Sequence, residues 1–316
     1  MKKPLVFVVV LNWNHLDDLI LTMEPLLIQD YPNMQILISD NGSTDGSQSY
    51  IKKNYPNVIL IENNDNLGWA AGNNVGIKYA IQQNADYILL ANNDLYFEND
   101  KLISILVDDL IELKDKNINI IGANVNYFYM KEKMHNDGWI MYPESEKKGH
   151  VFNKYRNDYK FELPCNIKTV DFVSGCFMLI DKVVFERIGL IDEAFFIYGE
   201  ETEFSLRAWS VGCGSVTNTD LTIYHKISAT NKVGSPFSMY LKTRNLIYLL
   251  RKHKSIIPDI NYFIYLYYYS FVKSLIKVII FPNKYSGKQS KVLNSIFKGF
   301  LDGVIFKVKG KNGIKF

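Results

Sequence analysis

The 316-residue sequence has few cysteines and lacks the common glycine-rich motifs that bind phosphate. Its three cysteines, Cys165, Cys176 and Cys213, are widely spaced and form no C-x-x-C pair. This usage argues against a disulfide framework or a zinc site and favours a reducing cytosol. No G-x-G-x-x-G follows the first apolar segment and no G-x-x-x-x-G-K-S/T occurs, so the dehydrogenase and P-loop classes are disfavoured.

Acidic residues are scarce toward the C-terminus. From Ser238 onward the chain has 15 Lys and Arg and only two acids, whereas the residues before Ser238 carry a net charge of −10. This asymmetry predicts two surfaces with different partners. At the other end, the apolar run Leu5–Leu11 resembles the start of a signal peptide but stops at Asn12 without a small-residue cleavage site, so we expect a buried first strand there.

Short apolar segments alternate with segments of helical length from the start to about Asn117. The apolar segments are Leu5–Leu11, Gln35–Ser39, Val58–Glu62 and Tyr87–Ala91. The segments that predict helices are Leu16–Gln29, Ser47–Asn54 and Ala70–Asn84, with another after Asn99. The alternation predicts an α/β fold, with a mostly parallel central sheet and helices on both faces.

Each predicted strand ends in polar residues. Asn12 follows the first strand, Asp40 the second, Asn63 the third and Asn92-Asn93-Asp94 the fourth. In a parallel sheet these ends share one edge, where open α/β folds bind ligands. Asp94, after two amides, suits a Mg²⁺ or Mn²⁺ ion that keeps its remaining positions for water and phosphate, although the segment Tyr87–Asp94 taken alone favours a plain turn.

Two further loops allow a ligand-binding and a purely structural interpretation. In Asp40–Gly46, Asp40 can accept a hydrogen bond from a nucleobase, or the loop is a capped turn into the next helix. Gly68, Gly72 and Gly76 permit close approach of either a nucleotide or the sheet.

The segment 118–163 predicts surface loops and short strands, to which we assign no chemistry.

Acids gather again in the second half of the chain. Glu200, Glu201 and Glu203 crowd a predicted helix start, and Arg207 lies one turn beyond Glu203. A solvated helix start explains this cluster without function. A partly desolvated carboxylate at this position would also serve as a general base, because burial raises its pKa toward neutrality.

Two other segments frame this cluster. Val170–Ile180 predicts two strands interrupted at Ser174-Gly175, where the chain can approach a ligand closely. His225 follows the predicted strand Leu221–Tyr224 and is either a structural histidine or a ligand.

Taken together, these loops resemble a family 2 glycosyltransferase with the A-type nucleotide-sugar fold, most closely its rhamnosyltransferase-like branch. The resemblance runs from about Val6 to Arg244. Its carriers are Val8–Asn14, Asp40–Ser47, Asn66–Asn73, Leu90–Asp94, Phe196–Glu201 and His225.

The resemblance implies a role for each matching residue. Asp40 and the Leu11-Asn12 backbone would hold the nucleoside, with Asn66 and Gly68 near ribose and base. Asn93 and Asp94 would lie at the donor diphosphate, with Asp94 binding Mg²⁺ or Mn²⁺ and His225 as a further metal ligand. Glu201 would be the general base that activates the acceptor hydroxyl for attack with inversion at the anomeric carbon.

This chain departs from the family pattern at two places. The acidic pair is usually Glu-Asp, whereas here it is Glu200-Glu201, so either Glu201 acts from slightly further back or Glu200 takes the role. Asn92 and Asn93 replace aspartates often seen in the metal motif, which leaves Asp94 with less anionic support.

The basic C-terminal segment has a different composition. Residues 262–281 are almost wholly apolar and aromatic, interrupted by Lys273 and Lys277. They are compatible with a membrane span, a helix lying on an anionic bilayer surface or a helix packed on the first domain. The charge bias favours the bilayer surface. The lysines match no nucleic-acid motif, so no nucleic-acid partner is expected.

We therefore expect a nucleotide-sugar-binding catalytic domain at residues 1–235 and a basic, membrane-associating helical region at residues 236–316. The predicted enzyme is an inverting, metal-dependent glycosyltransferase of cell-surface polysaccharide synthesis. It would be cytoplasmic and peripheral on the inner face of the membrane, with a nucleotide-diphosphate sugar as donor and a glycan or lipid-linked saccharide as acceptor. A rhamnose donor and a homo-oligomer are compatible with the sequence. The alternatives are a sugar nucleotidyltransferase and a catalytically inactive glycan-binding subunit.

Overall fold

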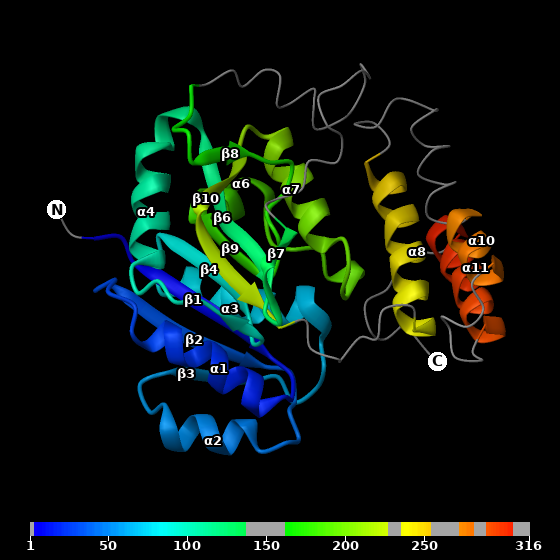
Figure 1. Ribbon diagram of the computed structural model, residues 1–316, viewed down its shortest axis with the longest axis horizontal. Coiled ribbons are helices and arrows are strands. Elements are labelled where there is room, and N and C mark those ends of the chain that lie inside the picture. Colours follow the sequence, from blue (N-terminus) through cyan, green and yellow to red (C-terminus); the bar gives the residue numbers. More distant parts are fainter. Residues whose placement is uncertain (1–2, 137–161, 227–234, 254–271, 281–288, 306–316) are drawn as a thin grey trace.

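The computed structural model describes residues 3–136, 162–226, 235–253, 272–280 and 289–305 (Figure 1). Most of the segment 262–281, expected to contact the membrane, lies outside these residues. Among the described helices, none combines the length and apolar character needed to cross a bilayer.

A ten-stranded mixed sheet forms the centre of the molecule, with the strand order β3-β2-β1-β4-β9-β6-β10-β5 and with β7 and β8 paired to β6 and β10. Its strands are β1 Val6–Asn12, β2 Met34–Asp40, β3 Ile59–Glu62, β4 Tyr87–Asn92, β5 Leu95–Tyr96, β6 Ile118–Tyr127, β7 Met130–Asn136, β8 Ile167–Thr169, β9 Phe177–Asp181 and β10 Gly214–His225. The first four strands are parallel, as the sequence predicts, while β9 runs antiparallel to both β4 and β6.

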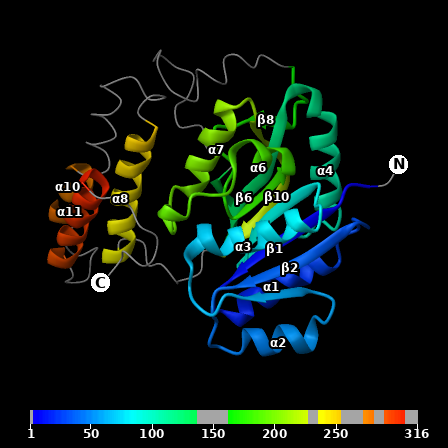
Figure 2. The same cartoon turned by 180° about the vertical axis from the view of Figure 1, so that it is seen from behind.

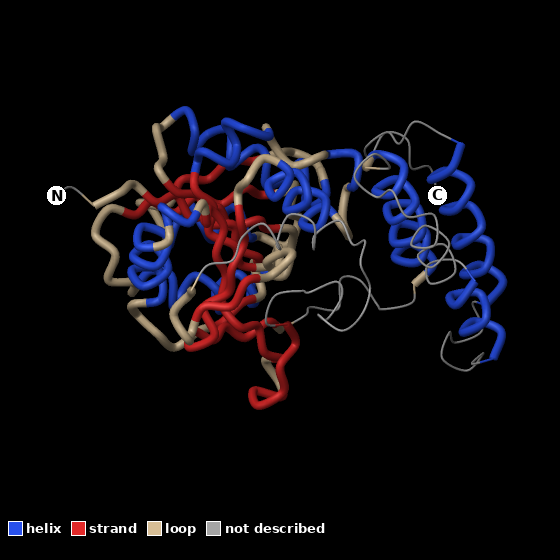
Figure 3. The backbone as a smooth tube through the Cα atoms, turned by 90° about the horizontal axis from the view of Figure 1, so that it is seen from above, coloured by secondary structure: helices blue, strands red, loops and turns tan. Residues whose placement is uncertain are grey.

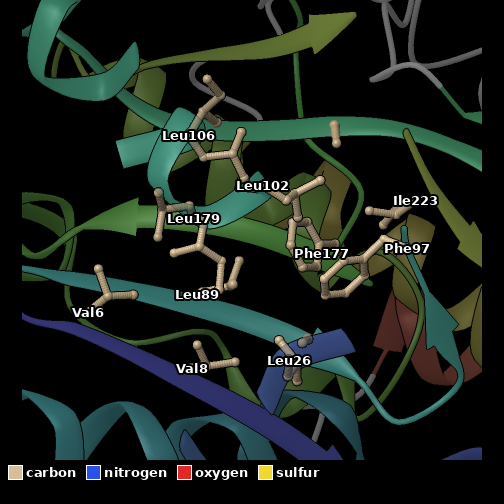
Figure 4. Close-up of a cluster of buried hydrophobic side chains, with 14 of the residues drawn as sticks. Val6, Val8, Leu26, Leu89, Phe97, Leu102, Leu106, Phe177, Leu179 and Ile223 are labelled. Carbon is tan, nitrogen blue, oxygen red and sulfur yellow. The ribbon is translucent and has the colours of Figure 1, made fainter. Parts of the chain in front are cut away.

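Helices cover both faces of the sheet, as expected for an α/β fold. They are α1 Leu16–Leu27, α2 Ser47–Asn54, α3 Gly68–Gln82, α4 Leu102–Glu112, α6 Lys182–Ile188 and α7 Glu200–Ser210. Alternate residues of β1 face opposite sides. Val6 and Val8 pack toward α1 and α4 (Figure 4), whereas Phe7 and Val9 belong to the cluster that includes residues of α3, α6 and α7. Figure 2 shows these three helices from behind. Burial on both faces explains why β1 is a continuous apolar run.

Two sequence predictions about strands are wrong. The segment expected to hold surface loops and short strands begins instead with the ten-residue, mostly buried strand β6, whose asparagines Asn119 and Asn124 hid its core character. The strand expected before Ser174-Gly175 is instead a buried irregular segment with a single bridge residue. Polar backbone groups of this segment form hydrogen bonds that do not belong to a regular strand ladder. Val170 N–H donates to Ser215 O at 3.0 Å, and Trp209 Nε1 donates to Asp171 O at 3.0 Å.

Helix α3 lies unusually close to the sheet. A Cβ on Gly72 would come within 2.5 Å of Leu11 Cδ1, and a Cβ on Gly76 within 2.4 Å of Val9 Cγ1. These two glycines are therefore explained by helix–sheet packing.

Three C-terminal helices group beside the sheet domain: α8 Pro236–Lys252, α10 Lys273–Ile280 and α11 Gln289–Ile305 (Figure 3). Ser235 caps α8 by accepting a hydrogen bond from Ser238 N–H at 3.2 Å, and Pro236 follows at the first helical position. Gly299 and Gly303 let α11 approach α8, because a Cβ on either would clash with α8. Helix α11 thus packs on α8.

Candidate active site

Polar side chains at the ends of neighbouring strands form a hydrogen-bonded row along one edge of the sheet. Asn93 Nδ2 donates to Asn12 Oδ1 at 2.8 Å, and Asn12 Nδ2 donates to Asp40 Oδ1 at 2.8 Å. Asn12 and Asp40 are also register partners in β1 and β2. Three of the residues predicted to bind the nucleotide-sugar are therefore brought together, with Leu11 beside them on β1.

Asp40 is fully buried, and its carboxylate organises the loop that follows it. One oxygen accepts from Ser43 N–H at 2.9 Å and from Gln48 Nε2 at 2.7 Å, while the other accepts from Asn12 Nδ2 and the Ser43 hydroxyl. Four donors already occupy this side chain, so in the structure it holds the loop in place. Its contact with a nucleobase stays a prediction.

Asn66 and Gly68 lie where helix α3 begins, beside the Asp40 loop. Asn66 Oδ1 accepts a hydrogen bond from Gly68 N–H at 2.9 Å, and Asn41 Nδ2 donates to Gly68 O at 3.0 Å. Gly68 has φ +82°, a left-handed conformation that glycine adopts at little cost. These contacts bring the third predicted loop to the same edge of the sheet.

Asp94 and His225 form the acidic and basic pair of the site. Asp94 is 5% exposed, and its Oδ1 lies 3.0 Å from His225 Nε2. The pairing of β5 with β10 places them together, since His225 is the register partner of Leu95. Burial lowers the pKa of His225, but Cys176 and Asp94 outweigh this and raise the pKa well above its ordinary value.

Asp94 and His225 would give a divalent cation only a partial ligand set. One carboxylate and one imidazole stand side by side at the predicted donor edge, and both are ligand types that Mn²⁺ accepts. Among the described residues no group of three or more His, Cys, Asp or Glu side chains is arranged to hold a metal. The pair would therefore need phosphate oxygens and water to complete the coordination.

Trp69 connects this pair to the second acidic cluster. Its Nε1 donates to Asn92 Oδ1 at 3.0 Å, close in sequence to Asp94. A Cβ on Gly175 would lie 3.1 Å from the Trp69 ring and 3.4 Å from Glu201 Cβ, so these three residues are neighbours. Asp94 and Glu201, far apart in sequence, thus lie on the same side of the molecule with Trp69 between their loops.

Glu200 and Glu201 occupy the first turn of α7 but differ in environment. Glu200 is 4% exposed, and its Oε2 accepts no hydrogen bond from any described residue. Burial, reinforced by the charge of Glu201, raises the pKa of Glu200 well above its ordinary value. Glu201 is only partly buried, and burial raises its pKa as well.

Glu203, in the same turn, is a structural residue. Its carboxylate is fully buried and lies 2.8 Å from Arg207 Nε, 2.8 Å from Lys252 Nζ and 3.1 Å from His253 Nε2. Burial alone would raise the pKa of Glu203, but His253, Arg207 and Lys252 lower it to about 2. This cluster joins α7 to the end of α8.

Trp69 and Cys176 were not among the residues predicted from the sequence to have a role in the site. Trp69 lies within the segment Asn66–Asn73, where a large aromatic residue among small ones is an available signal of a buried contact. Cys176 follows Ser174-Gly175, and its Sγ lies 3.2 Å from Ser174 Oγ. Its approach to His225 depends on the three-dimensional fold, and nothing in the sequence indicates it.

Comparison with known proteins identifies the family that this geometry fits. The model of the family described as glycosyl transferase family 2 matches residues 7–189, more than half of the chain. The chain belongs to glycosyl transferase family 2. The family 2 match covers the four parallel strands, the Asp94 loop and β9, and confirms the family resemblance seen in the sequence.

Several curated relatives share this region. A hexosyltransferase of low-salt glycan biosynthesis from Haloferax volcanii is 28% identical over 67% of this chain and 65% of its own length. A dTDP-rhamnosyl transferase from Shigella flexneri is 28% identical over 62% of this chain and 64% of its own length. This family 2 chain therefore matches just under two thirds of the length of each. An N-acetylglucosaminyl-diphospho-decaprenol L-rhamnosyltransferase from Mycobacterium tuberculosis is 24% identical over 63% of this chain and 69% of its own length.

A solved structure supports the fold. A mannosyltransferase from Pyrobaculum calidifontis, in complex with GDP-Man and Mn²⁺, superposes with a TM-score of 0.59 at 12% identity, covering 96% of this chain and 88% of that one. At this identity the likeness shows the fold alone. The expected A-type glycosyltransferase fold is confirmed.

Proposed function

We propose that this family 2 member is an inverting glycosyltransferase that moves a sugar from a nucleotide-diphosphate donor to a glycan or lipid-linked saccharide. The observation that supports it most is that Trp69 donates to Asn92, two residues before the Asp94–His225 pair, and also lies beside Gly175 and Glu201. The donor diphosphate would lie at Asn93 and Asp94, with the nucleoside over Leu11, Asn12, Asp40, Asn66 and Gly68. Rhamnose is the donor sugar favoured by the family branch.

Glu201 is the proposed general base. An inverting transfer needs one carboxylate that removes the acceptor proton while the hydroxyl attacks the anomeric carbon, because no covalent intermediate forms. Glu201 is partly exposed, and burial raises its pKa, which makes its carboxylate a stronger base. Glu200 is buried and favours its neutral form, so it is less suited to this role.

Asp94 and His225 are the proposed ligands of a Mg²⁺ or Mn²⁺ ion. Such an ion neutralises the charge that grows on the departing diphosphate. Independently of the ion, Asp94 is held at the sheet edge by β5, and Asn93 is fixed by its hydrogen bonds to Asn12 and to Asn14 O. These contacts preorganise the loop for a diphosphate.

We further propose that the enzyme works at the cytoplasmic face of an anionic membrane. The names of the Mycobacterium tuberculosis relative and of a similar Escherichia coli glucosyltransferase both include polyprenol-diphosphate sugars. The basic C-terminal region of this chain would match such a membrane. Exposed apolar side chains on α10 and α11 would contact it, namely Ile276, Ile279, Ile280, Phe297, Val304 and Ile305.

One assay tests the proposal and separates it from its two alternatives. Purified protein is incubated with a panel of nucleotide sugars and acceptors, with and without Mn²⁺ or Mg²⁺. The proposal predicts metal-stimulated release of nucleoside diphosphate. Release of pyrophosphate from a parallel mixture of nucleoside triphosphate and sugar 1-phosphate would indicate a nucleotidyltransferase, and binding without any product in either mixture would indicate an inactive glycan-binding subunit.

A further inference from the structure

The loop that leads into the two glutamates adopts an unusual backbone conformation. Phe196 has φ 64° and ψ −64°, and Ile197 N–H donates to Phe195 O at 2.8 Å, which together define a classic γ-turn, a rare and strained form. Tyr198 and Gly199 also have positive φ, at 78° and 91°. Non-glycine residues keep such conformations only where surrounding contacts impose them.

Helix α8 supplies most of these contacts through two adjacent side chains. Arg244 Nη2 donates to Ala194 O at 2.8 Å and to Phe195 O at 3.0 Å. Asn245 Nδ2 lies within hydrogen-bonding distance of three carbonyl oxygens, those of residues 195, 197 and 198, at 2.7–2.9 Å. Arg244 Nε also donates to Asn245 Oδ1 at 2.8 Å, which turns the Asn245 amide nitrogen toward the loop.

Of the carbonyls of residues 194–198, only that of Phe196 is not bound by α8, and helix α3 binds it. Phe196 O accepts hydrogen bonds from Trp69 N–H at 2.6 Å and Ala70 N–H at 3.3 Å. Five consecutive carbonyls, 194–198, are therefore fixed by α8 or α3. Both Arg244 and Asn245 are 2% exposed, so water does not compete for these bonds.

We propose that Arg244 and Asn245 are positioning residues that fix the backbone of residues 194–199 and so aim Glu201 at the donor site. Tyr198 and Gly199 directly precede the acidic pair, and Glu201 packs beside Gly175 and Trp69. The backbone N–H of Trp69 also donates to Phe196 O in this loop. The same group of hydrogen bonds therefore fixes the positions of both Glu201 and Trp69. This inference rests on the proposed function for its kinetic part only.

The first test uses the full-length chain and does not depend on activity. Hydrogen–deuterium exchange is compared for wild type, Asn245→Ala and the control Asn294→Ala, which alters an exposed asparagine on α11. We expect faster exchange at the amides of Trp69, Ala70 and Ile197 in Asn245→Ala alone, with circular dichroism confirming that both variants stay folded. Exchange at the wild-type rate would overturn the inference.

The second test measures transfer. Misplacing a base by about 1 Å costs about 100-fold, so kcat of Asn245→Ala should fall by that order while the donor KM stays within about twofold. Asn245→Gln, which keeps the amide donors, should recover part of the loss. An unchanged kcat, or a loss confined to KM, would contradict positioning. If the wild type transfers no sugar, the proposed function fails, whereas the exchange experiment still decides this inference.

Discussion

Glu200 and Glu201 are neighbours in sequence, yet the first turn of α7 gives them different surroundings. Glu200 points into the protein, where one carboxyl oxygen lacks a donor among the described residues. Glu201 stays partly accessible beside Trp69 and Gly175. Leaving a buried carboxylate oxygen unsatisfied costs free energy that protonation relieves, so the neutral form of Glu200 is favoured. Glu200 can therefore remain a neutral acid while Glu201 titrates and acts as the base.

The pH dependence of transfer follows from this division. Burial raises the pKa of Glu201 above the ordinary 4.5, and a general base works only when deprotonated. We expect kcat to fall as the pH decreases through a value above 4.5. The measurement is a pH profile of kcat at saturating donor, with unfolding followed at each pH as the control. A kcat that stays flat down to pH 4.5 would exclude Glu201 as the base.

At the residue scale, the sequence was most informative where a residue type and its place at a strand end pointed to the same role. The structure places Asp94 and Asn93 at that sheet edge, and their roles there were predicted in this way. The γ-turn at Phe196 was not, because a rare conformation of an aromatic residue leaves no compositional signal. The approach of Cys176 to His225 depends on β9 and β10 lying on either side of β6, which no local pattern specifies.

At the scale of elements, helices α7 and α8 are joined by a buried ionic cluster. Glu203 of α7 faces Lys252 and His253 at the end of α8, and Arg207 completes the cluster from one turn away. The fall in the pKa of Glu203 from 4.5 to about 2 corresponds to about 3 kcal/mol of stability. The Glu203–Arg207 pair was predictable from its four-residue spacing, whereas the approach of Lys252 and His253 is seen only in the folded structure.

The variant Glu203→Gln tests this cluster. It removes the carboxylate that Arg207, Lys252 and His253 share, so the free energy of unfolding at neutral pH should fall by about 3 kcal/mol. Because the folded pKa is lowered, the stabilisation is present above pH 4.5 and is lost as the pH falls toward 2. The difference from wild type should shrink over that range.

Chemical denaturation at several pH values provides the measurement. Glu186→Gln is the control, since Glu186 is exposed on α6. Equal destabilisation by both variants, or a Glu203→Gln effect that is independent of pH, would refute the structural role of the cluster.

At the scale of the whole molecule, the α/β fold was predictable because strand and helix periods alternate clearly over the first half of the chain. The mixed character of the sheet was not, since β9 inserts antiparallel between β4 and β6 after a long excursion in sequence. The predicted boundary between residues 235 and 236 stays a prediction. Helix α8, just beyond it, contacts both the acidic turn and α11.

Membrane association can be tested with one exposed residue of the C-terminal helices. Ile279 on α10 is 66% exposed and would enter the bilayer surface, so Ile279→Glu should weaken binding to anionic vesicles about tenfold. Ile28, which ends α1 and is equally 66% exposed, provides the matched control Ile28→Glu. Cosedimentation measures both. Equal binding by wild type and Ile279→Glu would reject this face as the contact.

The proposed chemistry depends most on the identity of the base. The decisive measurement compares kcat for sugar transfer by wild type, Glu201→Gln and Glu200→Gln. Glutamine imitates a protonated glutamate, so Glu200→Gln should lose less than about tenfold, whereas Glu201→Gln should lose at least about 100-fold with the donor KM little changed. Near-normal turnover by Glu201→Gln would contradict the account.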